Sequence, residues 1–316
     1  MSEDRSPGRV AHHQLMRLFT KHMAETLLCE GGAVRWGRWT FRGRTLVLAY
    51  HNVIPKGERP CGDRSLHLPQ GAFAAQLDVL LATHDVVPLA AIHEAPNGPR
   101  PRVVLTFDDA HRGAVTAGIA EVVKRRLTAT IFVAPGLFGS TTWWDRLADA
   151  ATGAVPAPLR SAALSVHQGL GERVLKSLGP GSASLPPWAE IATEDEVRAA
   201  AAQPGITLGA HTWNHPNLTA LGADDLAAEL ARPLAWLRDL GDLALPWLAY
   251  PYGLTSPTVA QAVARAGYAG AFRINGGWMP KVQPGPATLF HLPRLNVPSG
   301  VSLNGFRLRA AGLLGH

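Results

Sequence analysis

Short runs of β-branched and large apolar residues alternate with amphipathic segments along most of this chain. The runs predict core strands, and apolar positions recurring every three or four residues between them predict helices. The expected strands span 46–53, 102–107, 128–134, 206–211, 247–250, 269–274 and 291–297. The expected helices lie near 73–81, 114–126, 194–202, 226–237 and 258–266. Repeated strand–helix units without a glycine-rich phosphate loop favour an α/β barrel over a dinucleotide-binding sheet.

Two places interrupt this regular pattern. Glycine, proline and serine punctuate residues 136–187, which we interpret as an inserted helical segment on one face of the fold. Pro233 lies inside the helical segment 226–237 and should kink or split that helix, because proline lacks the N–H that the helix needs.

The N-terminal stretch 14–28 predicts a helix that carries several large apolar residues on or near one face. They are Leu15, Leu18, Phe19, Met23, Leu27 and Leu28. Such a helix either docks on the core or lies on a membrane surface, and we favour docking because most amphipathic helices cover a core. The apolar region of a signal peptide and the run of about 20 apolar residues of a membrane span are both missing, so we expect a location in the cytoplasm or at the membrane periphery.

Composition bounds the remaining choices. The chain has 316 residues, 47% of them hydrophobic and 17% charged, enough for one barrel of about 250 residues with extensions. The formal charge of +6 favours acidic partners, but the basic residues are scattered without a dense Lys/Arg run, so we expect no nucleic-acid binding. Cys29 and Cys61 are the only cysteines, which excludes a disulfide framework and a cysteine-based zinc site.

The strand 102–107 ends in two adjacent carboxylates, Asp108 and Asp109. The carboxyl ends of parallel strands are where α/β folds carry their chemistry. Neighbouring carboxylates repel each other unless a third group offsets their charge. A divalent metal is the simplest such group, since one carboxylate then binds it and the other stays free as a base.

A histidine pair, His211 and His215, follows the strand 206–211. The four-residue spacing brings both imidazoles to one side in a helix or a tight turn, and Pro216 makes a compact loop the better interpretation. Together with an aspartate from another strand end, the pair forms a two-histidine, one-carboxylate set with open positions. That set suits hydrolysis by a Lewis acid.

Three segments in order resemble the motifs of the polysaccharide deacetylase family, carbohydrate esterase family 4, which carries the NodB-homology domain. The segment 106–109 (TFDD) is similar to the family's TFDDG, 211–218 (HTWNHPNL) to its H-[ST]-x-x-H-P-x-L, and 249–253 (AYPYG) to its R-x-P-Y-G. The resemblance covers roughly 46–297. It implies a distorted (β/α)7-type barrel as the fold class, with a catalytic domain 46–300 that contains the insertion 136–187, an extension 1–45 and a tail 301–316.

The resemblance also implies roles for single residues. Asp109, His211 and His215 would bind one divalent metal, with Zn2+ expected and Co2+, Ni2+ or Fe2+ as alternatives. Asp108 would be the general base that takes a proton from the metal-bound water. The backbone N–H that follows Pro251, that of Tyr252, would hold the oxyanion.

A general acid is expected from elsewhere, because no late L-x-H motif follows Arg294. The segment 48–53 (LAYHNV) resembles the YH motif of the circularly permuted branch of the family, which makes His51 the candidate acid and His291 its rival. Tyr250 stands near the place of the family's motif arginine, and Arg294 is the candidate to replace that guanidinium beside Asp108.

Two further departures from the family pattern concern Ala110 and the insertion. Ala110 replaces the usual glycine after the aspartate pair, which matters only if the backbone φ is positive there. Trp143 and Trp144 in the insertion either stack on sugar rings or pack in a core, and we favour the core.

The function that follows is metal-dependent removal of N-acetyl groups from amino sugars of a polysaccharide or glycoconjugate. The alternatives are an O-acetyl esterase and a hydrolase of small non-peptide amides on the same barrel. A catalytically silent binding protein would be expected to lose Asp108, a metal ligand or the acid, and the chain retains all of them. The expected partner is an N-acetylated glycan, with peripheral membrane contact through the N-terminal helix as an added expectation.

Overall fold

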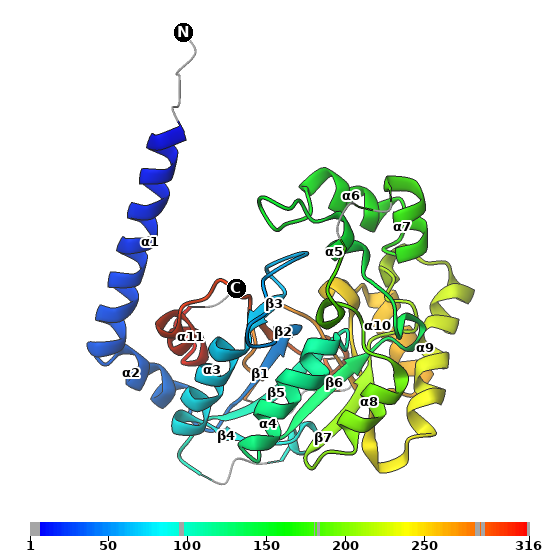
Figure 1. Cartoon of the computed structure of the whole chain (residues 1–316). Coiled ribbons are helices and arrows are strands. Elements are labelled where there is room, and N and C mark those ends of the chain that lie inside the picture. Colours follow the sequence, from blue (N-terminus) through cyan, green and yellow to red (C-terminus); the bar gives the residue numbers. More distant parts are fainter. Residues whose placement is uncertain are drawn as a thin grey trace.

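The computed structural model describes residues 7–94, 98–179, 181, 184–281, 285 and 288–314, and among the first eighteen residues it describes the side chain of Met16 alone. Seven parallel strands form one curled sheet in the order β10-β1-β5-β6-β7-β8-β9. They are β1 (Thr45–Tyr50), β5 (Arg102–Asp108), β6 (Ala129–Val133), β7 (Ile206–Ala210), β8 (Ala244–Ala249), β9 (Gly270–Phe272) and β10 (Leu295–Asn296). A two-residue strand, β4 (Asp85–Val86), pairs with the start of β5 (Figure 1).

The sheet curls far enough to bring its two edges together. A parallel bridge joins Phe272 of β9 to Leu292, three residues before β10. Every residue of β1, β5 and β6 is buried, as expected for parallel strands that are covered on both faces. The prediction of a distorted α/β barrel is confirmed.

Helices cover the outer face of the sheet (Figure 1). They are α3 (Gln70–Thr83), α4 (Ile119–Lys124), which follows a π-helical turn at Ala114–Gly118, α8 (Glu194–Ala201), α9 (Ala223–Arg238) and α10 (Pro257–Ala266). Their buried faces repeat the predicted periodicity, and in α3 Phe73, Leu77 and Leu80 are completely buried. A capping box on Thr193 and Glu196 defines where α8 begins.

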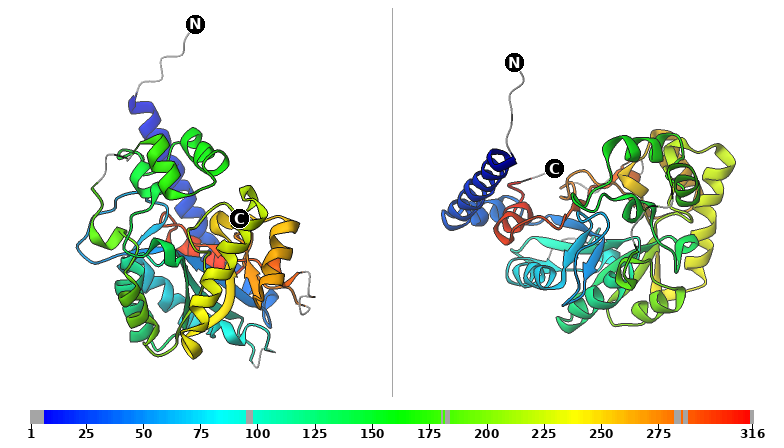
Figure 2. Two further views of the ribbon diagram at one scale, coloured as in Figure 1. Left: turned by 90° about the vertical axis from the view of Figure 1, so that its right-hand side faces the viewer. Right: turned by 45° about the horizontal axis from the view of Figure 1, so that its top comes forward.

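The stretch 136–187 contains α5 (Trp143–Leu147), α6 (Ala157–Ser165) and α7 (Gly171–Leu178). These three helices gather at one end of the barrel (Figures 1 and 2). They enclose a small core that includes Trp143, Trp144 and Val174. The inserted helices therefore form a cap with an apolar centre.

Three helices lie along one side of the barrel: α1 (Pro7–Glu30), α2 (Ala33–Thr40) and α11 (Leu303–Ala310). The prediction that the apolar face of the N-terminal helix docks on the core is wrong for its described residues. Phe19 and Leu27 are 61% and 64% exposed. Leu15 and Leu18 lie outside the described side chains. No helix in the described part of the chain is long and apolar enough to span a bilayer.

Other local expectations need correction. The expected strand 46–53 breaks at His51, because β2 (Asn52–Ile54) leaves the barrel and pairs with β3 (His67–Pro69) in a separate sheet. Helix α9 runs through Pro233 without splitting, since Leu230, Leu234 and Leu237 around it are buried and this packing offsets the lost hydrogen bond. The segment before β10 is a 3-10 turn, Leu289–His291, rather than a strand.

Candidate active site

The predicted site residues come from loops at one end of the barrel. Asp108 ends β5, His211 follows β7, Tyr252 follows β8, and His51 follows β1. Since all these strands are parallel, their carboxyl ends meet at the same edge. The side chains line a cavity of about 480 Å³, whose walls include His51, Asp108, Asp109, Trp144, Arg160, His211, His215 and Tyr252.

The loops around this cavity hold their residues in unusual backbone conformations. Among the described residues, seven other than glycine have positive φ, and five of them lie in the three motif segments or directly after the first: Asp109, Ala110, Thr212, His215 and Tyr252. Ala110 has φ 61°, so the replacement of glycine does place a side chain in the left-handed region. Each such residue costs about 1–3 kcal/mol, and strain of this kind clusters at functional sites.

Glu229 of α9 holds the histidine loop in place. Its carboxylate accepts hydrogen bonds from the backbone N–H groups of Trp213 and Asn214, at 2.9 and 2.8 Å, and from the Asn214 side chain at 2.7 Å. The loop between His211 and His215 therefore depends on a buried carboxylate from a covering helix.

Asp109, His211 and His215 bring one donor atom each to within 4.8 Å of one another. The two Nε2 atoms lie 3.0 Å apart, and Asp109 Oδ1 lies 3.5 Å from His211 Nε2 and 3.2 Å from His215 Nε2. His211 Nδ1 must carry its proton, because it donates at 2.7 Å to the carbonyl of Ala249. Its Nε2 therefore directs a lone pair at the other two atoms.

This donor set fits a divalent cation. Asp109 Oδ1 is buried and has no hydrogen-bond partner among the described residues. Burial lowers the pKa of His211 to about 4, so its imidazole is neutral and able to ligate. Burial raises the pKa of the Asp109 carboxyl, but the imidazoles of His215 and His211 outweigh it and the net shift is downward. Two imidazole nitrogens and one carboxylate, all buried, form a set typical of zinc.

Asp108 has a separate partner, the guanidinium of Arg294. Arg294 Nη1 donates to Asp108 Oδ1 at 2.6 Å and Nη2 donates to Oδ2 at 2.7 Å, while Nη1 also reaches Thr106 Oγ1 at 3.0 Å. Both charged groups are buried, and the guanidinium carbon lies 5.2 and 5.8 Å from the ring centroids of Phe132 and Phe272. Burial raises the pKa of Asp108, but the Arg294 charge prevails and holds it below its ordinary value.

The guanidinium thus reaches Asp108 from the segment before β10. Tyr250, which stands near the family's motif arginine in sequence, points elsewhere, since its hydroxyl donates to the carbonyl of Phe290 at 2.9 Å.

His51 lines the cavity that Asp108 lines, whereas His291 is not among the lining residues. Burial lowers the pKa of His51, and the carboxylates of Asp108 and Asp109 oppose that shift. The Tyr252 hydroxyl accepts from Trp143 Nε1 at 3.0 Å, and the structure records no hydrogen bond from the Tyr252 N–H to another described residue.

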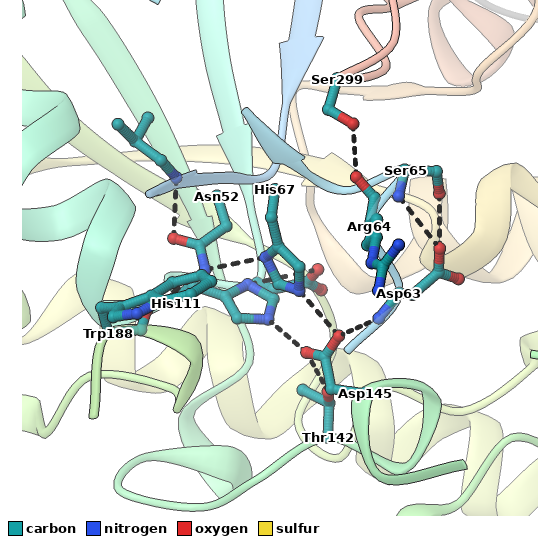
Figure 3. Close-up of polar contacts among 12 residues, drawn as sticks. Asn52, Asp63, Arg64, Ser65, His67, His111, Thr142, Asp145, Trp188 and Ser299 are labelled. Carbon is teal, nitrogen blue, oxygen red and sulfur yellow. Dashed lines mark hydrogen bonds and ion pairs between the residues drawn. The ribbon is translucent and has the colours of Figure 1, made fainter. Parts of the chain in front are cut away.

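The sequence did not predict a buried polar network that lies beside the cavity (Figure 3). Asp145 of α5, fully buried, accepts hydrogen bonds from His67 Nε2 at 2.8 Å, Thr142 Oγ1 at 2.8 Å and the Asp63 N–H at 2.9 Å. His111 Nε2 lies 3.3 Å from its second oxygen. The other nitrogen of His111 lies 3.9 Å from Asp109 Oδ2. The network therefore connects the inserted cap to the loop of the candidate metal ligand.

Close backbone approach makes this network feasible. Gly62 has φ 60°, and a Cβ at this position would lie 2.3 Å from Asp145 Oδ1. His67 accepts from Asn52 Nδ2 at 3.0 Å through Nδ1, so its Nε2 carries the proton that Asp145 accepts. The only hint in the sequence was an aspartate next to two tryptophans and a histidine two residues after Asp109.

The family model "Polysaccharide deacetylase" matches residues 95–271. A search among curated protein sequences found no match.

Several solved structures share the fold. The deacetylase PplD of Streptococcus pyogenes, in complex with acetate, aligns with TM-score 0.57 at 18% identity over 84% of this chain and 96% of that chain. IcaB from Ammonifex degensii aligns with TM-score 0.58 at 20% identity over 86% and 98%. BC0361, a polysaccharide deacetylase from Bacillus cereus, aligns with TM-score 0.59 at 14% identity over 85% and 69%.

Replacing the guanidinium that pairs with Asp108 should destabilise the protein strongly. Arg294→Ala leaves a buried carboxylate without its partner, a change that costs roughly 3–5 kcal/mol of unfolding free energy. Urea unfolding followed by circular dichroism measures it. Arg198→Ala is the matched control, because its pair with Glu194 is exposed and should contribute about 1 kcal/mol or less. Equal losses of unfolding free energy in the two variants would contradict the conclusion that Arg294 neutralises a buried Asp108.

Removing the carboxylate at the centre of the cap network should also reduce stability. Asp145→Ala leaves His67 and His111 without their buried acceptor, and we expect a loss of roughly 3–5 kcal/mol. Asp149→Ala, an exposed aspartate of the same insertion, should cost about 1 kcal/mol or less. The measurement is again the urea midpoint, and a loss for Asp145→Ala as small as that of its control would refute the network's importance.

Proposed function

Because this chain belongs to the polysaccharide deacetylase family, and so is a hydrolase of acetylated sugars, we propose that it removes N-acetyl groups from amino sugars of a polysaccharide or glycoconjugate with one divalent metal. Zn2+ is the first candidate for that metal, with Co2+, Ni2+ or Fe2+ as alternatives. The solved relative in complex with acetate supports release of an acetyl group.

One observation carries the proposal. The cavity is lined by a buried donor set of one carboxylate and two imidazoles, and a second carboxylate with its own guanidinium lies in the same wall. Asp109, His211 and His215 would hold the metal. When bound, the metal supplies Lewis acidity that polarises the acetyl carbonyl.

Asp108 accepts a proton from the attacking water in this proposal. The two-point pair with Arg294 holds the carboxylate ionised and fixes the direction of its oxygens. A base that is already ionised and oriented needs no rearrangement when the water transfers its proton.

The oxyanion and the leaving amine need groups of their own. Pro251 shapes the turn that presents the Tyr252 N–H, which has no hydrogen-bond partner among the described residues and would stabilise the oxyanion. His51, on the wall beside Asp108, gives a proton to the amine as the C–N bond breaks. The resemblance to the circularly permuted branch with an N-terminal YH motif stays a prediction, and His51 is the residue on which it depends.

Acetate release tests the reaction class. Incubation with N-acetylglucosamine oligomers should release acetate, and removal of the metal with a chelator should abolish release until Zn2+ is restored, because the proposed reaction needs a metal at Asp109, His211 and His215. Enzymatic determination of acetate measures the product. Release from O-acetylated sugars alone would instead support an esterase, and undiminished release after metal removal would overturn the mechanism.

Within this test, two variants separate the base from the metal site. Asp108→Asn should reduce the rate by about 10²–10⁴-fold while metal stays bound, whereas His211→Ala should lose the metal. Metal analysis of the purified protein gives the second readout. His167→Ala, a histidine outside the cavity lining, is the control that should change neither.

The general acid can be assigned by a matched pair of histidine variants. His51→Gln should reduce kcat for an N-acetyl substrate by about 10²–10⁴-fold with metal content unchanged, because the amine would leave unprotonated. His291→Gln should leave kcat near that of the wild type, since His291 does not line the cavity. A larger loss for His291→Gln would transfer the role to that residue.

A further inference from the structure

We propose that α1 and α2 form a docking surface for a lipid bilayer that contains anionic lipid. This surface, called the docking face below, consists of outward apolar residues of α1, two tryptophans of α2 and the arginines around them. It is independent of the hydrolytic chemistry, so either proposal can fail without the other.

Helix α1 presents its apolar residues to solvent. Met16, Phe19, Met23 and Leu27 recur at helical spacing and are 50%, 61%, 50% and 64% exposed. Burying one such side chain contributes about 1.5–3 kcal/mol, so a continuous exposed stripe is unfavourable unless something covers it.

The opposite face of α1 is the one that contacts the protein, and it is polar. Glu25 is buried and accepts a hydrogen bond from Ser302 at 2.5 Å. Thr26 Oγ1 accepts from Asn304 Nδ2 at 3.0 Å, and Cys29 Sγ lies 3.6 Å from the Asn304 carbonyl. A helix that covers a core turns its apolar face inward, whereas α1 turns its polar face toward the protein. Polar contacts to α11 and its N-cap hold α1 with the apolar stripe facing outward.

Helix α2 adds two exposed tryptophans. Gly37 packs so closely on the C-terminal end of α11 that an added Cβ would lie 2.3 Å from the Ala311 carbonyl oxygen. Trp36 and Trp39 are 62% and 60% exposed. Tryptophan is enriched at membrane–water interfaces, where its ring contacts the acyl boundary and its N–H contacts water.

Arginines without acidic partners accompany these apolar groups. Arg35, Arg38, Arg42 and Arg307 form no ion pair with any described carboxylate, and Arg42 stacks over Trp39 at 4.9 Å from the ring centroid. Arg35, Arg38 and Arg307 line a cavity of about 260 Å³ between α1, α2, α3 and α11. An unpaired guanidinium cluster beside an apolar stripe is complementary to phosphate head groups above acyl chains.

The positive charge of the docking face favours an anionic lipid surface as its partner over a second copy of this chain. Two docking faces in contact would bring their unpaired arginines together, which is repulsive. Figures 1 and 2 show α1, α2 and α11 together on one side of the barrel, with the N-terminal part of α1 standing away from the body. In Figure 1 the cap formed by α5–α7 lies apart from α1, toward the opposite side of the molecule.

Vesicle co-sedimentation tests the proposal. The full chain should sediment with vesicles of phosphatidylcholine and phosphatidylglycerol, bind vesicles of phosphatidylcholine alone at least about tenfold more weakly, and dissociate as salt is raised. The variant Phe19→Ser/Met23→Ser/Leu27→Ser should lower partitioning by at least about tenfold, because each substitution removes apolar area that the bilayer would bury. Its thermal unfolding midpoint should stay near that of the wild type, since the three side chains are exposed.

Val166→Ser is the matched control, because Val166 is an exposed apolar residue (70%) at the end of α6 in the inserted cap. This variant should bind vesicles as the wild type does. Failure to bind either vesicle type, or equal binding by the triple variant, overturns the proposal. Light scattering measures whether the protein forms a dimer through the docking face. A dimer that the triple variant dissociates would identify a second copy as the occupant and would likewise overturn it.

Discussion

Two carboxylates on adjacent residues, both buried at the end of β5, are the constraint around which the barrel is arranged. Their mutual repulsion in a low-dielectric interior is large, and the fold separates their environments. Asp108 meets Arg294, which stands just before β10 and reaches it across β1, whereas Asp109 faces the two imidazoles that follow β7. The strand order thus determines which carboxylate is neutralised by the protein and which remains able to hold a metal.

Much of the barrel could be predicted from the sequence because buried parallel strands are apolar without interruption. The runs at 102–107 and 128–134 became β5 and β6 with nearly the predicted ends. The three motifs could also be placed at strand ends, and the structure brings Asp109, His211 and His215 together. Their roles stay proposals, but their proximity follows from parallel strands sharing one carboxyl edge.

The features that escaped prediction depend on contacts between distant segments. The break at His51 reflects the pairing of β2 with β3, and the uninterrupted α9 reflects packing around Pro233. The orientation of α1 was predicted wrongly because hydropathy shows which residues share a helix face but not which face the protein contacts. The polar contacts that decide it come from α11, some 275 residues away along the chain.

The network around Asp145 determines whether the insertion can be exchanged on its own. A surface insertion is commonly exchanged or trimmed as an independent module, because its loss exposes little that the parent fold needs. Here the insertion supplies the acceptor for two buried histidines, one on β3 and one two residues after Asp109. Exchange of this insertion for one without Asp145 would leave both histidines without their buried acceptor. The cap and the two barrel positions beneath it therefore depend on one another for their buried polar contacts.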